Sequence, residues 1–104
     1  MYTYLLTHYA ERDFDKELAY SEEHWGKRHA KKYAQELKKQ MKILCKNPYA
    51  YRERSDIVSG LRMCRYKGNY IVYTVVEEYK QVVITGLHSV YQNMDPEALQ
   101  KRMP

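Results

Sequence analysis

The amino-acid sequence predicts an α+β fold. It comprises an N-terminal strand, an antiparallel helical hairpin packed on a three- to four-stranded antiparallel sheet, and a short C-terminal helix. Apolar residues recur every three or four positions between residues 10 and 46, the period of an amphipathic helix. From residue 61 to residue 88 the pattern changes to short β-branched and aromatic runs separated by turn residues. The 104 residues contain no Pro/Gly/Ser-rich linker, so residues 1–104 are expected to form a single domain.

A strand and then a helix are expected in the first quarter of the chain. The segment Tyr2–Thr7 is rich in tyrosine, leucine and threonine, which is typical of a strand. From Ala10 the period becomes helical, and Gly26 supplies the stop signal. The apolar stripe of this helix consists of Ala10, Phe14, Leu18, Ser21 and Trp25.

A second helix is predicted from about Lys27 to Lys46. Asn47-Pro48 ends it, because proline disfavours the α conformation in the residue before it. Since only Gly26 separates the two helices, we expect an antiparallel hairpin. The apolar stripe of the second helix is Ala30, Tyr33, Ala34, Leu37, Met41, Leu44 and Cys45. Its opposite face is basic and polar: Arg28, Lys31, Lys32, Gln35, Lys38, Lys39, Lys42 and Lys46.

The second half of the chain is predicted to form a meander of strands. After a polar loop, the expected strands are 61–67, 70–76 and 81–88. Gly68-Asn69 suits a two-residue hairpin turn. The middle strand is apolar at nearly every position, so both of its faces should be covered. Asn93 or Asp95, before Pro96, starts a short helix that ends near Arg102. We expect one core that contains Trp25, Leu37, Met41, Ile71, Val75 and Ile84.

The net charge of +5 is concentrated in one segment. Residues 27–54 hold ten basic and two acidic side chains, a net charge of +8, whereas residues 1–26 carry −4. Such a segment attracts polyanions or an acidic protein, and a solvated helix face is the alternative. No apolar run reaches the roughly 18 residues of a membrane span, and the N-terminus lacks the pattern of a secretory signal. We therefore expect a cytoplasmic domain without a membrane partner.

Arg62 is the first candidate for chemistry. On a strand it shares one face with Tyr66, and that face could form a concavity on the side of the sheet away from the helices. A guanidinium there suits a phosphate or a carboxylate, because it donates two parallel hydrogen bonds. The alternative is a structural ion pair with Asp56, Glu77 or Glu78.

His88 and Tyr91, at the end of the last strand, are the second candidates. A histidine can act as a general acid or base, and a tyrosine can orient a hydroxyl or stack on a nucleobase; simple packing is the alternative. We expect no metal and no cofactor. The four histidines and the cysteines Cys45 and Cys64 show no metal-binding spacing, and no phosphate-cradling glycine loop occurs.

Several motifs, taken in order, resemble the RelE/ParE superfamily of bacterial toxins over about residues 4 to 100. They are HWGKRHAKKYAQEL, Asn47-Pro48, Gly60-Leu61-Arg62, YIVY, and LH followed by MDPEAL. The resemblance implies the toxin of a type II toxin–antitoxin pair, which inhibits growth and stabilises a plasmid or chromosome. It also implies an antitoxin that is encoded beside the toxin and holds it inactive in a hetero-oligomeric complex.

Two activities within the superfamily fit this sequence. The ParE branch inhibits DNA gyrase without its own turnover, and is similar at Trp25-Gly26, at Gly60-Leu61-Arg62 and at LH followed by Met94-Asp95. The RelE branch cuts mRNA on the ribosome, and Arg62, His88 and Tyr91 match its catalytic roles. The sequence departs from each branch at one point. Met94 follows His88 by six positions, a longer spacing than the ParE branch usually has. The arginine that the RelE branch has after the last strand is missing here. We favour the ParE branch.

A third reading is a non-toxic basic module that binds nucleic acid through the face of the 27–46 helix. For the toxin, the side chains expected to contact the target or the antitoxin are Lys31, Lys38, Lys39, Lys42, Arg62, Tyr66, Met94 and Asp95.

Overall fold

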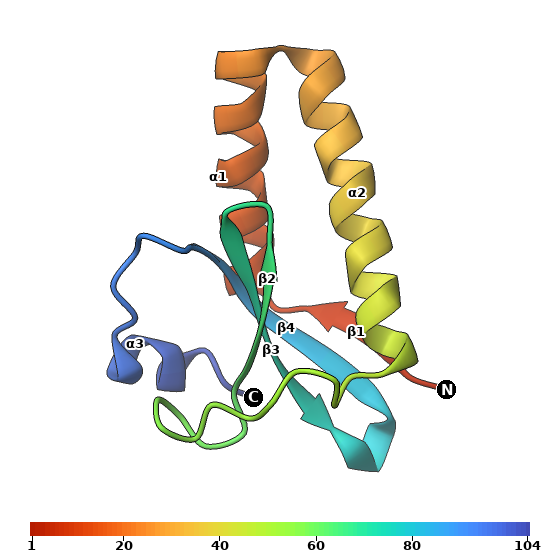
Figure 1. Ribbon diagram of the computed structural model, residues 1–104, viewed down its shortest axis with the longest axis vertical. Coiled ribbons are helices and arrows are strands. Elements are labelled where there is room, and N and C mark those ends of the chain that lie inside the picture. The colour runs from red at the N-terminus through yellow and green to blue at the C-terminus, as the bar shows by residue number, and fades with distance from the viewer.

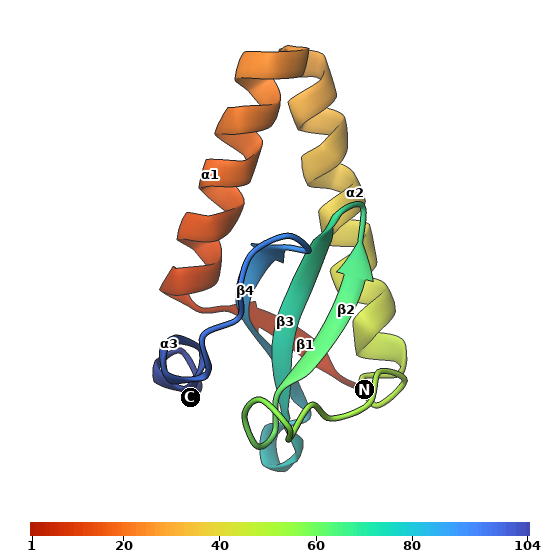
Figure 2. The ribbon, with the colours of Figure 1, turned by 60° about the vertical axis from the view of Figure 1, so that its left-hand side comes forward.

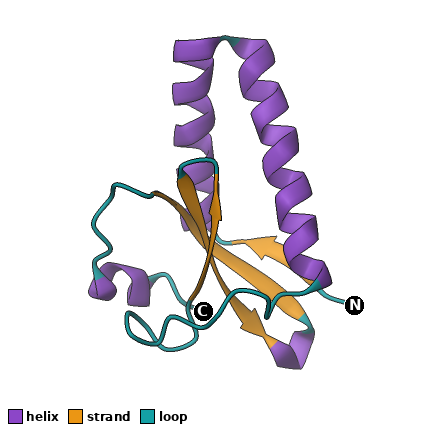
Figure 3. Cartoon of the chain, in the orientation of Figure 1, coloured by secondary structure: helices purple, strands orange, loops and turns teal.

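The computed structural model describes all 104 residues, and it confirms the predicted fold class and order of elements (Figures 1 and 3). In chain order the elements are β1 (Thr3–Leu6), α1 (His8–Trp25), α2 (Lys27–Lys46), β2 (Arg62–Tyr66), β3 (Asn69–Val76), the 3-10 turn η1 (Glu77–Tyr79), β4 (Gln81–Ser89) and α3 (Pro96–Lys101). The helical hairpin stands above the sheet, and α3 lies near the C-terminus on one side (Figure 1). No helix is both long and apolar enough to cross a bilayer.

Local signals start and separate the two long helices. The hydroxyl oxygen of Thr7 accepts a hydrogen bond from the Ala10 amide at 3.2 Å and so caps α1. Gly26 joins α1 to α2 with a φ of +93°, a conformation that favours glycine. The stripe predicted for α2 is the one it buries, and Leu37 in its middle is 1% exposed.

The sheet has the strand order β1-β4-β3-β2. The pairs β2–β3 and β3–β4 are antiparallel, as predicted. β1 instead pairs with β4 in parallel, from Thr3 beside Gln81 to Leu6 beside Ile84, so the sheet is mixed rather than wholly antiparallel. The two helices return the chain to the end of the sheet where β1 begins. β2 therefore runs in the direction of β1, and two hairpin reversals give β4 the same direction.

The β2–β3 turn lies one residue earlier than the sequence suggested. Lys67 and Gly68 occupy it, with φ values of 48° and 79°, and Tyr66 pairs with Asn69 across it. Asn69 belongs to the strand because its buried side chain donates a hydrogen bond to the Tyr33 hydroxyl at 2.9 Å. That tertiary contact decides the register.

Apolar side chains form a core on each face of the sheet. Figure 2 shows β3 between β4 and β2, with the helical hairpin above the strands. The larger core lies between the sheet and the helical hairpin and contains Leu37, Met41, Ile71 and Ile84, with Val75 packed against it. The smaller core lies under the C-terminal segment and contains Val58, Leu61, Val72 and Leu99. The expectation that β3 is covered on both faces is thus confirmed.

The expectation that Trp25 belongs to the core is wrong. Trp25 is 68% exposed, because it is the last residue of α1 at the tip of the hairpin, which extends beyond the sheet (Figure 1).

Candidate functional site

Arg62 lies on the sheet face that is covered by the helical hairpin. Its partner across the β2–β3 pair is Tyr73, and Cys64 shares its parity; both are buried in the helix-side core. Tyr66 packs against the same core. The expected concavity for Arg62 and Tyr66 on the opposite face is therefore wrong, because the parity of β2 sends both side chains toward the helices.

The guanidinium of Arg62 is held by the loop that follows α2. Its Nη1 donates to the Tyr51 carbonyl at 2.6 Å, and its Cζ lies 4.9 Å from the centre of the Tyr49 ring. The alternative of an ion pair is not formed: Asp56 pairs with Arg54, and Glu77 pairs with Lys80. Arg62 thus anchors a loop instead of standing free for an anion.

A carboxylate and two phenols support this arrangement. Glu77 accepts hydrogen bonds from the Tyr2 hydroxyl at 2.7 Å and from the Tyr49 hydroxyl. Lys80 and these two phenols lower the pKa of Glu77 to about 2. The bond to Glu77 in turn raises the pKa of Tyr49 to about 12, so this phenol stays protonated.

His88 is buried on the opposite face of the sheet. It lies across from Tyr70, which packs against the smaller core, and only 6% of the residue is exposed. Its Nε2 is buried and has no hydrogen-bond partner. Burial lowers the pKa of His88, and the positive charge of Arg102 lowers it further, while Asp13 opposes this. The imidazole is therefore neutral at pH 7.

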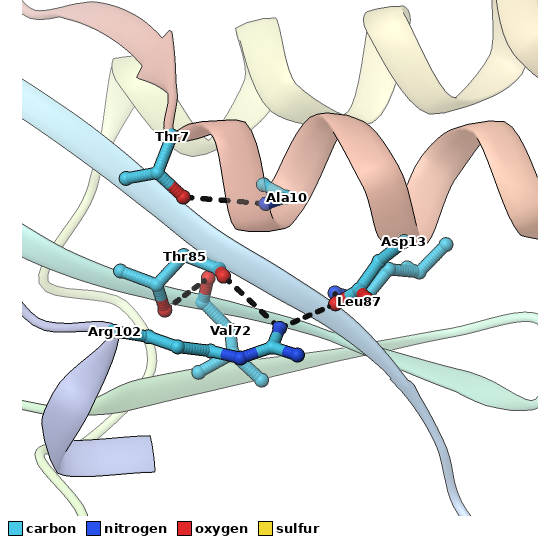
Figure 4. A network of polar contacts seen from close by, with 7 residues as sticks. All are labelled: Thr7, Ala10, Asp13, Val72, Thr85, Leu87 and Arg102. Atoms are coloured by element: carbon cyan, nitrogen blue, oxygen red, sulfur yellow. Dashed lines mark hydrogen bonds and ion pairs between the residues drawn. The ribbon is translucent and has the colours of Figure 1, made fainter. Parts of the chain in front are cut away.

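An ion pair that the sequence did not indicate joins Asp13 to Arg102 (Figure 4), and both charges act on His88. Asp13 of α1 accepts hydrogen bonds from the Leu87 amide at 3.1 Å and from Arg102 Nη1 at 2.6 Å. β1 pairs with β4 only as far as Ile84, so the edge of β4 beyond that residue is open to α1. Asp13 fills this gap in the ladder, and Arg102 fixes the C-terminal segment to it.

Gly86 leaves the space that this cluster needs. A Cβ at position 86 would lie 2.7 Å from Arg102 Nη1, 2.7 Å from His88 Nε2 and 3.0 Å from Asp13 Oδ2. Arg102 also donates to the Thr85 carbonyl at 3.4 Å, and its Cζ lies 5.3 Å from the centre of the Tyr9 ring. The one sequence signal that could have indicated this close approach is a glycine in the interior of the last strand, two positions before His88.

The structure does not bring the three candidate catalytic residues together. Arg62 and His88 lie on opposite faces of the sheet, since their cross-strand neighbours Tyr73 and Tyr70 belong to different cores. Tyr91 is 94% exposed in the loop after β4. No group of three histidine, cysteine or acidic side chains is placed to hold a metal ion.

Arg62 and Tyr66 aside, the predicted contact residues fall into two groups. Lys31, Lys38 and Lys42 form one exposed stripe along α2, with Lys39 beside it, and none of the four forms an ion pair. The residues Met94 and Asp95 instead hold the C-terminal segment. Met94 packs on the smaller core, and the Asp95 carboxylate accepts a hydrogen bond from the Glu97 amide and caps α3.

Comparison with known proteins identifies the family. Residues 4–89 match the model described as the ParE toxin of the type II toxin-antitoxin system, parDE. The chain belongs to the ParE toxin family. It is also 29% identical over 75 residues to Toxin ParE1 of Caulobacter vibrioides, an alignment that covers 72% of this chain and 78% of that protein. This places it in the ParE branch of the RelE/ParE superfamily, as a toxin of a type II system that has an antitoxin partner.

This ParE-family toxin exposes an aromatic cluster at the tip of its hairpin. Trp25 lies 6.0 Å from His29 between ring centres, and Tyr20, 55% exposed, stacks on His24 at 3.9 Å. The sequence pattern did not indicate this cluster, because Trp25 continues the apolar stripe of α1. Exposed tryptophan and tyrosine are typical of the residues that contribute most to protein interfaces.

Proposed function

We propose that this ParE-family toxin acts in the cytoplasm by binding DNA gyrase and inhibiting it, without catalytic turnover of its own. The observation that supports this most is the separation of Arg62 from His88 by the sheet. A nuclease needs its acid, base and phosphate ligand within hydrogen-bond reach of one phosphodiester. Here the free nitrogen of His88 is buried, and the Arg62 guanidinium is held by the Tyr51 carbonyl.

Binding alone requires an exposed surface with anchoring side chains, and the helical hairpin offers one. Its tip carries the exposed aromatic rings of Trp25 and Tyr20. Below the tip, the lysine stripe of α2 contributes positive charge, and none of its lysines forms an ion pair within the protein. Such charges accelerate association with an acidic surface and set its salt dependence. In this proposal the tip and the stripe contact gyrase.

A supercoiling assay with purified gyrase tests the proposal. We expect the purified toxin to inhibit supercoiling. We expect Lys38→Glu/Lys39→Glu to weaken that inhibition, while Tyr91→Phe and His88→Gln change it less than about threefold, provided that circular dichroism shows both to be folded. The same samples are added to a translating extract with a defined message. Ribosome-dependent cuts that are lost in His88→Gln would show a RelE-type nuclease and refute the proposal.

The third reading, a non-toxic nucleic-acid module, has a separate outcome. It predicts binding to DNA of any sequence that weakens steeply with salt, and no effect on growth when the chain is expressed. The gyrase proposal predicts growth arrest accompanied by DNA breaks before any loss of message.

A further inference from the structure

A pocket of about 240 Å³ lies between α1 and α2 near the tip of the hairpin. The β2–β3 turn, which lies beside α2 in Figure 2, also reaches it through Lys67. Tyr33 in the pocket belongs to the helix-side core, whereas Trp25 is exposed, so the pocket leads from the surface toward that core. Its lining includes three aromatic rings and two carboxylates: Tyr20, Trp25, Tyr33, Glu17 and Glu36.

The pocket holds one carboxylate that has no partner. Glu36 forms an ion pair with Lys67. Glu17 is half-buried and forms no ion pair. Burial raises the pKa of Tyr33, and the negative charge of Glu17 raises it further, so Glu17 acts on the interior of the pocket. A carboxylate in this position favours a cation as the occupant.

Ser21 provides a second polar group without a partner. The residue is 3% exposed and lines the pocket, and its Oγ is buried and has no hydrogen-bond partner. Buried polar groups are usually hydrogen-bonded, because leaving one unpaired destabilises the fold. A donor that enters the pocket would supply the missing hydrogen bond. The occupant is therefore expected to be a cation that carries N–H groups.

The aromatic rings of the pocket favour a guanidinium. Ring faces attract cations, and a guanidinium is planar, stacks on such rings and is less strongly hydrated than an ammonium. The same surface already holds one cation in this way: Lys67 pairs with Glu36, and its Nζ lies 5.8 Å from the centre of the Tyr66 ring. His29 is the remaining lining residue, with its ring 6.0 Å from that of Trp25.

We propose that this pocket binds an arginine side chain of gyrase. The guanidinium donates hydrogen bonds to the Glu17 carboxylate and to Ser21 Oγ, and packs against the ring of Trp25. None of the lysines of the α2 stripe lines the pocket, so the stripe and the pocket contact different groups of the target. The inference rests on the proposed function, because gyrase supplies the arginine.

Trp25 allows a direct test in the unmodified protein, since it is the only tryptophan of the chain and lines the pocket. The probe is Nα-acetylargininamide, and the control is Nα-acetylcitrullinamide, which has nearly the same shape and no charge. At constant ionic strength, we expect the arginine probe to change the fluorescence of Trp25 saturably at millimolar concentrations. The citrulline control should give no saturable change. Equal changes with both compounds would overturn the inference.

Substitutions in the pocket give an independent readout. We expect Glu17→Gln to weaken binding of the arginine probe at least about fivefold, because the carboxylate charge is lost. The matched control is Glu23→Gln, on an exposed residue of α1 that neither lines the pocket nor forms an ion pair; its effect should stay below about twofold.

Ser21→Ala separates a binding role from a packing role. We expect this variant to bind the arginine probe about threefold more weakly and to have an unchanged or higher Tm, because it removes an unpartnered hydroxyl. A lower Tm with unchanged binding would show that Ser21 serves packing alone and would refute its place in the site.

The supercoiling assay connects the pocket to gyrase. Glu17→Gln should raise the toxin concentration for half-inhibition at least about fivefold, and Glu23→Gln less than about twofold. If Trp25→Ala weakens inhibition while Glu17→Gln and Ser21→Ala act as the unmodified toxin does, no arginine enters the pocket, and the proposed function stands. If the unmodified toxin does not inhibit gyrase, the proposed function fails, and gyrase as the source of the arginine fails with it even where the probe binds.

Discussion

Replacing Arg102 with alanine removes the one ion pair that joins the C-terminal segment to α1. The guanidinium donates to Asp13 at 2.6 Å and to the Thr85 carbonyl at 3.4 Å. The side chains of Arg102 and Asp13 are 22% and 16% exposed, so water screens the pair only weakly. In Arg102→Ala, the Asp13 carboxylate keeps the Leu87 amide as its partner.

The expected cost follows from these contacts. A hydrogen bond to a charged group contributes about 1.5–3 kcal/mol to stability. Removing one partner of a fully buried ion pair costs about 3–5 kcal/mol, and the remaining exposure places this pair lower, at about 2 kcal/mol. For a domain of this length, each 1 kcal/mol lowers Tm by about 4–8 °C, so Arg102→Ala should lower Tm by about 8–16 °C.

Urea and thermal unfolding followed by circular dichroism measure this effect. The matched control is Lys101→Ala, since Lys101 is exposed and forms no ion pair; its effect should stay within about 0.5 kcal/mol. A double-mutant cycle with Asp13→Asn should give a coupling energy of at least about 1 kcal/mol. Equal effects of Arg102→Ala and Lys101→Ala, or strict additivity in the cycle, would refute the reasoning.

Three further predictions concern residues that the structure places unexpectedly. Gly86→Ala should destabilise the fold by about 1–3 kcal/mol in urea unfolding, because its Cβ would lie 2.7 Å from two polar nitrogens; unchanged stability would show that the cluster has room to move. The pKa of His88 in the folded protein lies below its ordinary value of 6.5. As the pH falls, the unfolded chain therefore takes up a proton at this residue before the folded protein does. The stability that the neutral imidazole contributes is present above pH 6.5 and is lost as the pH falls below that value toward the folded pKa. Tm should therefore fall between about pH 7.5 and pH 5.5, and less so in His88→Gln; parallel profiles would assign the loss to other groups. Trp25→Ala should change unfolding by less than about 0.5 kcal/mol while weakening gyrase inhibition at least about tenfold, and full inhibition would exclude the hairpin tip as a contact.

The sequence by itself determined the elements and their order, because the signals for these are local. The apolar period of α2 and the proline after Asn47 placed that helix correctly from Lys27 to Lys46. The continuous apolar run of β3 predicted a strand covered on both faces, which the two cores confirm. Pro96 marked the start of α3. Each of these features depends on residues a few positions apart.

Tertiary structure decided what depends on distant segments. The parallel pairing of β1 with β4 follows from the end of the sheet to which the helical hairpin returns the chain. The same hairpin extends past the sheet, so Trp25 is exposed although it continues an apolar stripe. Asp13 and Arg102 are 89 positions apart, and no local pattern links them. The separation of Arg62 from His88 required both the strand order and the parity of each strand, which depend on pairing between segments and not on the residues of either one.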